Sequence, residues 1–213
     1  GFTNTQTLGV SQTIFSGSTN NVLIGNNISL NISQIVDDTV VVGYNSQSEG
    51  SRNVLIGSSN FLDDDDSIGI GYNISTDTSD TIAIGNNIYT GGVDTIFIGH
   101  DSSGSDIGTT RSVGLGHKVY IEENDSVVIG YYATTSSDGD IVIGSESWTD
   151  IYNSSGPGDI VLGYGGVIED GSTVDFQLGS NTVYVTVSNL SAYINYETVS
   201  GSSSSASGKV VWK

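Results

Sequence analysis

A short apolar motif that ends in glycine recurs eleven times along this chain and constrains its fold more than any other feature. Each copy consists of Val, Ile or Phe, then a variable residue, then Ile, Leu or Val, then Gly; we call it the glycine motif. The steps between successive motif glycines are 18, 14, 14, 14, 14, 17, 14, 14, 19 and 16 residues. A period that varies only by insertion is typical of a solenoid whose coils accept loops at one edge. The motif glycines are Gly25, Gly43, Gly57, Gly71, Gly85, Gly99, Gly116, Gly130, Gly144, Gly163 and Gly179.

The content of one repeat follows from its length. The apolar residues of the motif alternate with a period of two, which indicates a β-strand, and Val, Ile and Phe favour strands. Fourteen residues are too few for a strand and a helix, but they can hold two short strands and two turns. A second strand is expected after each glycine, for example at 87–90 and 118–121. We therefore predict an all-β fold, a parallel β-roll solenoid with 14-residue coils and rungs about 4.8 Å apart.

The two faces of the motif strand bear on assembly. The first and third residues are large and apolar in every copy, so we predict that they fill the coil and that the second residue points outward. The second residue is also apolar in eight of the eleven copies, and a strand that is apolar on both faces is normally covered on both. Another copy of the chain is the simplest cover. The predicted interface residues are Leu23, Val41, Leu55, Ala83, Phe97, Val128, Val142 and Val161.

Composition limits the classes of partner and chemistry. The chain has 24 acidic and 5 basic residues, a formal charge of −19. Such a surface repels nucleic acids and anionic membranes, so we expect no nucleic-acid partner. No apolar run approaches the roughly 20 residues that cross a bilayer, so we expect no membrane insertion by this segment. There is no cysteine and there are only two histidines, and no catalytic set is apparent. We predict a protein without enzymatic activity or cofactor.

Two copies of the motif, Asp80–Gly85 and Asp125–Gly130, point to a known family. They resemble the head repeat of trimeric autotransporter adhesins, the YadA-like head, whose 14-residue repeat has an Asn-Ser-Val-Ala-Ile-Gly core. The resemblance covers about residues 20–179. It implies a left-handed parallel β-roll, three chains packed about a threefold axis, and a role in attachment.

The ends of the chain suggest how it is used. We divide it into a lead-in or capping segment (1–19), the β-roll (20–179), and a small C-terminal β tip with a Ser-rich segment (180–213). Similar head repeats occur in fibres of tailed bacteriophages, and a β tip without a heptad stalk or membrane anchor suits such a fibre. We expect an extracellular homotrimer on a virion surface. Its expected partners are a glycan or protein of the host cell surface and other virion or fibre proteins.

Two other functions remain open on the sequence alone. One is the head of a bacterial trimeric adhesin at the cell surface, which binds host matrix or cells. The other is a solenoid that binds ice or glycans. Ice binding would require regular ranks of Thr on one flat face. A glycan-degrading enzyme on a solenoid ranks below both, because it needs paired carboxylates in a groove.

Aromatic residues are the first candidates for receptor contact. Tyr and Trp are enriched where proteins bind partners, although the same side chains could instead cover a neighbouring chain. Four aromatic residues lie four positions after a motif glycine, where alternation predicts that they face outward, and two more lie in the predicted tip. The six candidates are Phe61, Tyr89, Tyr120, Trp148, Tyr193 and Trp212.

Metal binding is a weaker possibility at two places. His100 and His117 each follow a motif glycine in successive coils, so they should stack, and neutral imidazole is a common metal ligand. The alternative is that the position is merely polar, which we favour. The run Asp63–Asp66 could bind Ca²⁺, but it lacks a glycine-containing calcium loop and is better explained as a solvated turn.

Overall fold

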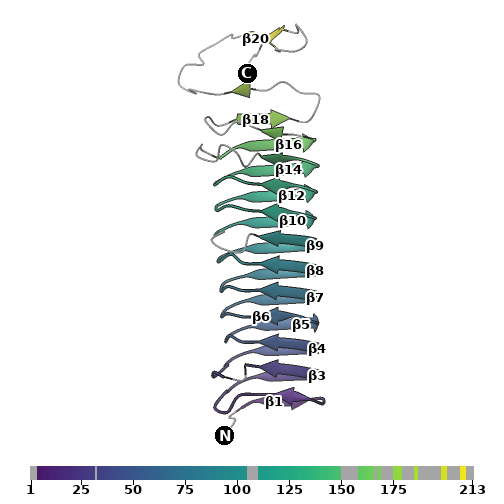
Figure 1. Cartoon of the computed structure of the whole chain (residues 1–213), viewed down its shortest axis with the longest axis vertical. Helices are drawn as coiled ribbons and strands as arrows, with labels where there is room; N and C mark the ends of the chain where they lie inside the picture. The colour runs from purple at the N-terminus through teal and green to yellow at the C-terminus, as the bar shows by residue number, and fades with distance from the viewer. Residues whose placement is uncertain are drawn as a thin grey trace.

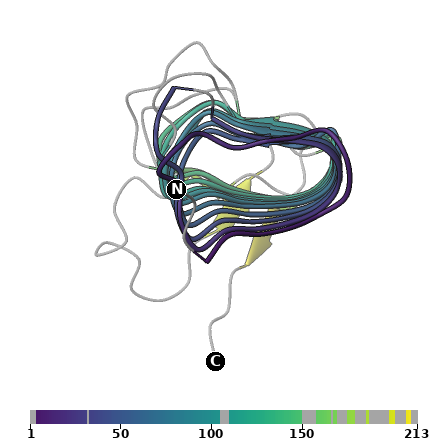
Figure 2. The same cartoon turned by 90° about the horizontal axis from the view of Figure 1, so that it is seen from below.

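The computed structural model is a parallel β-solenoid of about ten turns. It describes residues 4–31, 33–104, 110–149 and 158–165, and beyond these the backbone of five short strands. No helix occurs among the described residues. The coils stack into a straight rod (Figure 1), and viewed end-on they superpose as one flattened loop (Figure 2). The five short strands are β17 (Val167–Ile168), β18 (Asp175–Leu178), β19 (Val185–Thr186), β20 (Thr198–Ser200) and β21 (Ser207–Lys209).

Each coil contributes a motif strand and a second segment that follows its glycine. In five coils one strand runs through both segments, past the glycine at which the sequence suggested that the strand ends. These long strands are β3 (Val22–Leu30), β4 (Val40–Ser48), β7 (Ile68–Thr76), β8 (Ile82–Thr90) and β9 (Ile96–Gly104).

In the other coils the two segments are separate strands. The motif strands are β5 (Val54–Ser58), β10 (Val113–His117), β12 (Val127–Tyr131), β14 (Ile141–Ser145) and β16 (Ile160–Tyr164). Their second segments are β6 (Phe61–Leu62), β11 (Tyr120–Ile121), β13 (Thr134–Thr135), β15 (Trp148–Thr149) and β17. Two short strands precede β3, namely β1 (Gln6–Leu8) and β2 (Gln12–Thr13).

The stacking is parallel and in register with the glycine motif. Val54 lies opposite Ile68, Ile68 opposite Ile82, and Ile82 opposite Ile96. Where a step between glycines is longer, the extra residues leave this register unchanged, as in the pairing of Ile96 with Val113. After the roll the pairing changes: β18 pairs antiparallel with β19, and β20 pairs antiparallel with β21.

Two corners with positive φ turn each coil. The second residue after the motif glycine has φ of 55° at Asn73 and 52° at Asn87, and the second residue before the motif has φ of 58° at Asp66 and Asp80. Asn and Asp adopt this left-handed conformation more readily than other non-glycine residues. Their recurrence at these corners therefore has a backbone cause.

The prediction about the two faces of the motif strand was wrong. The second residue of the motif points into the coil: Leu23, Leu55 and Phe97 have exposed fractions of 0–1%. The first and third residues point outward, and Ile24 and Ile98 are 41% and 43% exposed. All of the predicted interface residues therefore lie inside the coil and cannot contact another chain: Leu23, Val41, Leu55, Ala83, Phe97, Val128, Val142 and Val161.

The second motif residue varies in size from Gly to Phe, which fits an interior column. The sizes in neighbouring coils compensate for one another. Gly114 stacks on Phe97, and a Cβ at Gly114 would lie 2.5 Å from Phe97 Cε1. A large ring in one coil thus occupies the space left empty by the next, which is a constraint of close-packed interiors.

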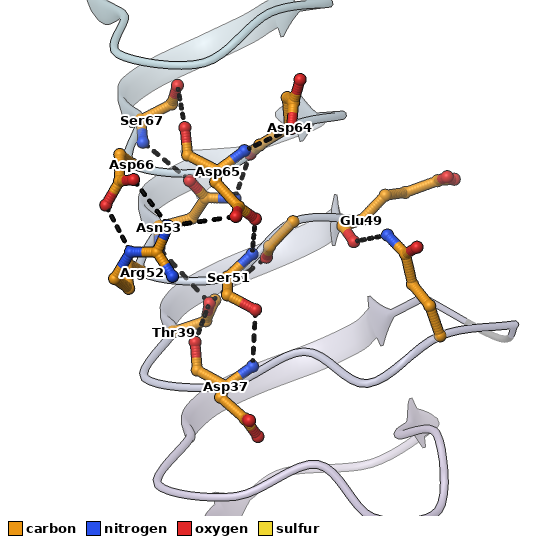
Figure 3. A network of polar contacts seen from close by, with 12 residues as sticks. Asp37, Thr39, Glu49, Ser51, Arg52, Asn53, Asp64, Asp65, Asp66 and Ser67 are labelled. Atoms are coloured by element: carbon orange, nitrogen blue, oxygen red, sulfur yellow. Dashed lines mark hydrogen bonds and ion pairs between the residues drawn. The ribbon is translucent and has the colours of Figure 1, made fainter.

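The residue before each motif is a small polar one that also points inward. Asn53, Ser67 and Thr81 are fully buried in successive coils. Asn53 Oδ1 accepts a hydrogen bond from Ser67 N (2.8 Å), and Ser67 Oγ accepts one from Thr81 N (3.2 Å). Asn53 Nδ2 donates to Asp64 O (2.7 Å), as Figure 3 shows. This polar column satisfies backbone groups at a buried corner, where an unpaired group would be costly.

The acidic run Asp63–Asp66 forms a bend that is tied to the coil below (Figure 3). Arg52 Nε donates to Asp66 Oδ1 (2.6 Å), and Arg52 Nη2 donates to Asp65 Oδ2 (3.0 Å). Ser51 N also donates to Asp65 Oδ1 (2.6 Å), and the hydrogen bond from Arg52 lowers the pKa of Asp66. These contacts favour the turn over a calcium site, because Arg52 already occupies two of the carboxylates.

Two buried members of the polar column carry carboxyl groups, Asp140 and Asp159. Asp140 has no exposed surface; its Oδ1 accepts from Asp159 N (2.8 Å) and its Oδ2 from Thr149 Oγ1 (2.6 Å). Burial raises the pKa of Asp140, and the hydrogen bonds offset this only in part. Asn53 stands at the equivalent position with the same Oδ1 acceptor role, so an amide fits there.

We expect Asp140→Asn to be more stable than the wild type at pH 7 but not at pH 3. The folded-state pKa lies above the unfolded value of about 3.9. The stability associated with the neutral carboxyl is therefore present below that value and is lost as pH rises through the folded-state pKa. The free energy of unfolding of both proteins, measured by denaturant titration at pH 3, 5 and 7, checks this. A variant whose advantage shrinks as pH rises would contradict it.

Candidate functional site

A flat apolar face runs along the outside of the stacked motif strands, which we call the motif sheet. The first and third motif residues of ten coils form two parallel columns, each residue stacked on its counterpart in the next coil. At about 4.8 Å per rung and two columns wide, the face covers on the order of 500 Å². We call it the Val/Ile face; its members are Val22, Ile24, Val40, Val42, Val54, Ile56, Ile68, Ile70, Ile82, Ile84, Ile96, Ile98, Val113, Leu115, Val127, Ile129, Ile141, Ile143, Ile160 and Leu162.

All of the side chains in the Val/Ile face are half-buried or exposed in the single chain. Ile24, Ile56, Ile98 and Ile143 are 40–43% exposed. A contiguous apolar surface of this size is large for a monomer and marks an interaction site. A covered apolar stripe was predicted on the motif strand, but the side chains that form it are the first and third motif residues and not the second.

A third outward column borders the Val/Ile face and contains aromatic residues that the sequence argument missed. It is formed by the residue after each motif glycine, and Tyr44, Tyr72, Tyr131 and Tyr164 are 43–61% exposed there. Tyr44 stacks on Ser58 and Tyr131 on Ser145, so tyrosines alternate with small residues over part of the column. Alternation from an outward first residue would have placed this column correctly.

The stacked second segments of the coils form a face that we call the second sheet, and the four receptor-contact candidates in the roll form a column on it. The register runs Phe61, Ser75, Tyr89, Ser103, Tyr120, Thr134, Trp148, so an aromatic residue alternates with a hydroxyl residue. Trp148 is 45% and Tyr120 40% exposed, whereas Phe61 and Tyr89 are half-buried. The remaining candidates, Tyr193 and Trp212, lie outside the described residues.

The surroundings of this aromatic column are polar. A groove of about 420 Å³ beside Phe61 is lined by amide side chains, including Asn45, Gln47 and Asn73. Tyr89 Oη donates a hydrogen bond to Asp77 Oδ2 (2.7 Å). Aromatic rings beside amide donors and acceptors can bind flat, hydroxyl-rich or peptide partners.

Threonine forms no outward rank on the described coils. Thr76, Thr90 and Thr149 are buried inside the coil, and Thr134 stands between Tyr120 and Trp148 on the outside. The feature that an ice-binding face requires is thus not present in this part of the chain.

A cluster of titratable side chains lies in the third column and at the positive-φ corner that follows it. His100 and His117 stack in successive coils, with their rings edge-to-face and the ring centroids 4.9 Å apart. Asp101 lies against both: its Oδ2 is 3.1 Å from His100 Nδ1 and 3.6 Å from His117 Nε2. The hydrogen bond from Asn87, together with the two imidazoles, lowers the pKa of Asp101. The predicted stacking of the histidines is present, and the structure adds a carboxylate that the sequence argument did not include.

Comparison with known proteins does not assign the chain to a family. No family model matches the chain, and no curated protein is significantly similar to it. Among the described residues there is no helix long and apolar enough to cross a membrane.

Proposed function

We propose that this chain is a non-enzymatic structural and attachment protein, a segment of an extracellular fibre of the phage tail-fibre type. Three copies pack through their Val/Ile faces into a left-handed β-roll trimer of the YadA-like kind. The trimer presents the aromatic column of the second sheet to a glycan or protein of a host cell surface. The observation that carries the proposal is the Val/Ile face, which continues over ten coils without a charged residue.

The Val/Ile face supports self-association better than contact with a varied partner. It is flat, repeats at every rung and consists of β-branched or leucine side chains, so a second copy matches it in spacing and chemistry. Leaving it in water costs roughly 25 cal/mol per Å² of apolar area. A threefold arrangement covers it on each chain with the same surface of its neighbours, as closed symmetric oligomers do.

Attachment follows from the same arrangement. A threefold fibre holds three copies of the aromatic column at fixed distances from one another. Simultaneous weak contacts multiply into avidity without any single tight site. The excess of acidic side chains, a formal charge of −19 per chain, keeps the fibre soluble and limits non-specific adhesion to other anionic surfaces.

We expect the aromatic column to carry the binding energy. The labelled chain is applied to arrays of bacterial surface polysaccharides and to whole bacterial cells, and retained protein is measured after washing. On any surface that retains the wild type, Trp148→Ala and Tyr120→Ala should each lower the apparent affinity at least tenfold, because buried aromatic anchors are typically worth about 2 kcal/mol.

Ser75→Ala provides the matched control, since it alters the same column at a position between two aromatic residues. This variant should bind as the wild type does. If Trp148→Ala and Tyr120→Ala also bind as the wild type does, the second sheet is not the attachment surface. If no surface retains the wild type, the attachment function itself is contradicted.

A further inference from the structure

We propose that His100, Asp101 and His117 form a binding site for one divalent transition-metal ion of the zinc class. The proposal is independent of the fibre function, because every group that it uses lies in one chain. The three side chains come from β9 and β10, which pair in parallel with His100 directly opposite His117. The ligand atoms of the three side chains all lie within 4.8 Å of one another.

The distances resemble those of a coordination sphere. Zinc binds imidazole nitrogen and carboxylate oxygen at about 2.0–2.2 Å in tetrahedral sites, which places neighbouring ligand atoms roughly 3.3–3.5 Å apart. Asp101 Oδ2 lies 3.1 Å from His100 Nδ1 and 3.6 Å from His117 Nε2. The three ligand atoms lie within 4.8 Å of one another, so an ion beside Oδ2 reaches both nitrogens when the imidazoles rotate toward it.

A hydrogen-bonded ladder orients the carboxylate for this role. Asn87 Nδ2 donates to Asp101 Oδ1 (2.8 Å), and Asn73 Nδ2 donates to Asn87 Oδ1 (2.9 Å). Oδ1 is thereby held from the coil below, while Oδ2 faces the two imidazoles. Outer partners that fix a ligand in this way typically contribute a factor of 10–100 to metal affinity.

The surroundings favour a cation and leave a ligand position open. The side chains of His100, His117 and Asp101 are 49%, 38% and 32% exposed, so water can complete the coordination. The adjacent Lys118 does not compete for Asp101, because its Nζ contacts the hydroxyl of Tyr132 and lies 4.3 Å from the centre of that ring. The strongly acidic chain raises the local concentration of cations. An imidazole–carboxylate set selects the zinc class over Mg²⁺ and Ca²⁺.

The test is titration of the metal-free full chain with Zn²⁺ at pH 7.5 by isothermal calorimetry, in excess Mg²⁺ to saturate non-specific carboxylates. We expect one ion per chain with a micromolar dissociation constant. Asp101→Asn should weaken binding at least tenfold and is expected to fold, because Asn occupies the equivalent corner at Asn73 and Asn87. His117→Gln should weaken it at least as much.

Controls separate this site from general binding to an acidic surface. Asp64→Asn removes one charge from an exposed turn and should leave the affinity unchanged. The two histidines are the only ones in the chain, so Zn²⁺ should shift both imidazole signals in NMR spectra at one equivalent. Equal affinity in wild type, Asp101→Asn and His117→Gln, unshifted imidazole signals, or no saturable binding would each overturn the proposal.

Discussion

Gly71→Ala should destabilise the coil stack by about 3 kcal/mol or more. Gly71 has φ of 140°, and a Cβ built there would lie 1.8 Å from the carbonyl oxygen of Gly85 in the next coil. No side-chain rotation can relieve a collision between a Cβ and a backbone oxygen. The two coils must move apart, which breaks the hydrogen bonds between β7 and β8. The same contact recurs along the rod, which explains why the fourth residue of the motif does not vary.

Gly69→Ala is the matched control, because it makes the same chemical change two residues earlier in the same strand. Gly69 lies opposite Ala83 in the next coil, so an alanine already occupies this column. A Cβ at Gly69 would lie 3.1 Å from Leu62 Cδ2 and 3.5 Å from Ile74 Cγ2, and these are ends of side chains that can shift. We expect a change within about 1 kcal/mol.

The measurement for both glycine variants is urea denaturation followed by circular dichroism at one fixed chain concentration. Midpoints are the quantity to compare, since long repeat arrays need not unfold in a single step. A Gly71→Ala midpoint equal to that of Gly69→Ala would show that the spacing between coils can relax. The backbone contact would then not explain the recurrence of glycine.

The sequence predicted the solenoid because the repeat is a property of the backbone. The motif glycines stack directly in neighbouring coils, so their spacing records the length of each coil. Insertions fall between motifs and leave the register intact, which is why steps of 17 and 18 residues did not obscure the period. Parallel pairing followed from a repeat too short to hold a helix.

The orientation of the motif strand was predicted wrongly because both of its faces are apolar. Alternation shows that Val40 and Val41 point in opposite directions but not which of them points inward. The residue before the motif is misleading in the sequence alone, because Ser67 and Thr81 share a face with the second residue and small polar side chains are usually exposed. In the structure both are buried, and Ser67 Oγ accepts a hydrogen bond from Thr81 N. The contribution of Asp101 to the histidine cluster could not be predicted from spacing, since it depends on the left-handed corner at φ of 52°.

The wild-type chain should have a solution mass near three times 22.1 kDa, and charge placed on the Val/Ile face should reduce it to the mass of one chain. We choose the double variant Ile70→Asp with Ile84→Asp, at adjacent positions of β7 and β8. Both side chains are half-buried and point outward in the single chain, so the carboxylates are solvated when the chain is alone. In a trimer six carboxylates would be buried near the axis without partners, which costs several kcal/mol per charge.

The matched control places two Asp side chains on the second sheet instead. Ser75→Asp with Ser103→Asp alters outward, half-buried positions of β7 and β9 and gives the same change in net charge. Light scattering at 0.15 M salt should report a trimer for this control and a single chain for the Val/Ile variant, with circular dichroism of both showing intact β structure. Screening at this ionic strength limits the repulsion between chains of formal charge −19.

The outcomes of this experiment distinguish the possible roles of the Val/Ile face. If both double variants dissociate, net repulsion rather than the face decides assembly. If the Val/Ile variant keeps the trimer mass, the chains associate elsewhere, and the proposed packing is wrong. A wild type that remains a folded single chain at all concentrations would remove the basis of the fibre, because avidity through three aromatic columns requires three chains. The Val/Ile face would then have to be explained as the binding site for a partner of different sequence.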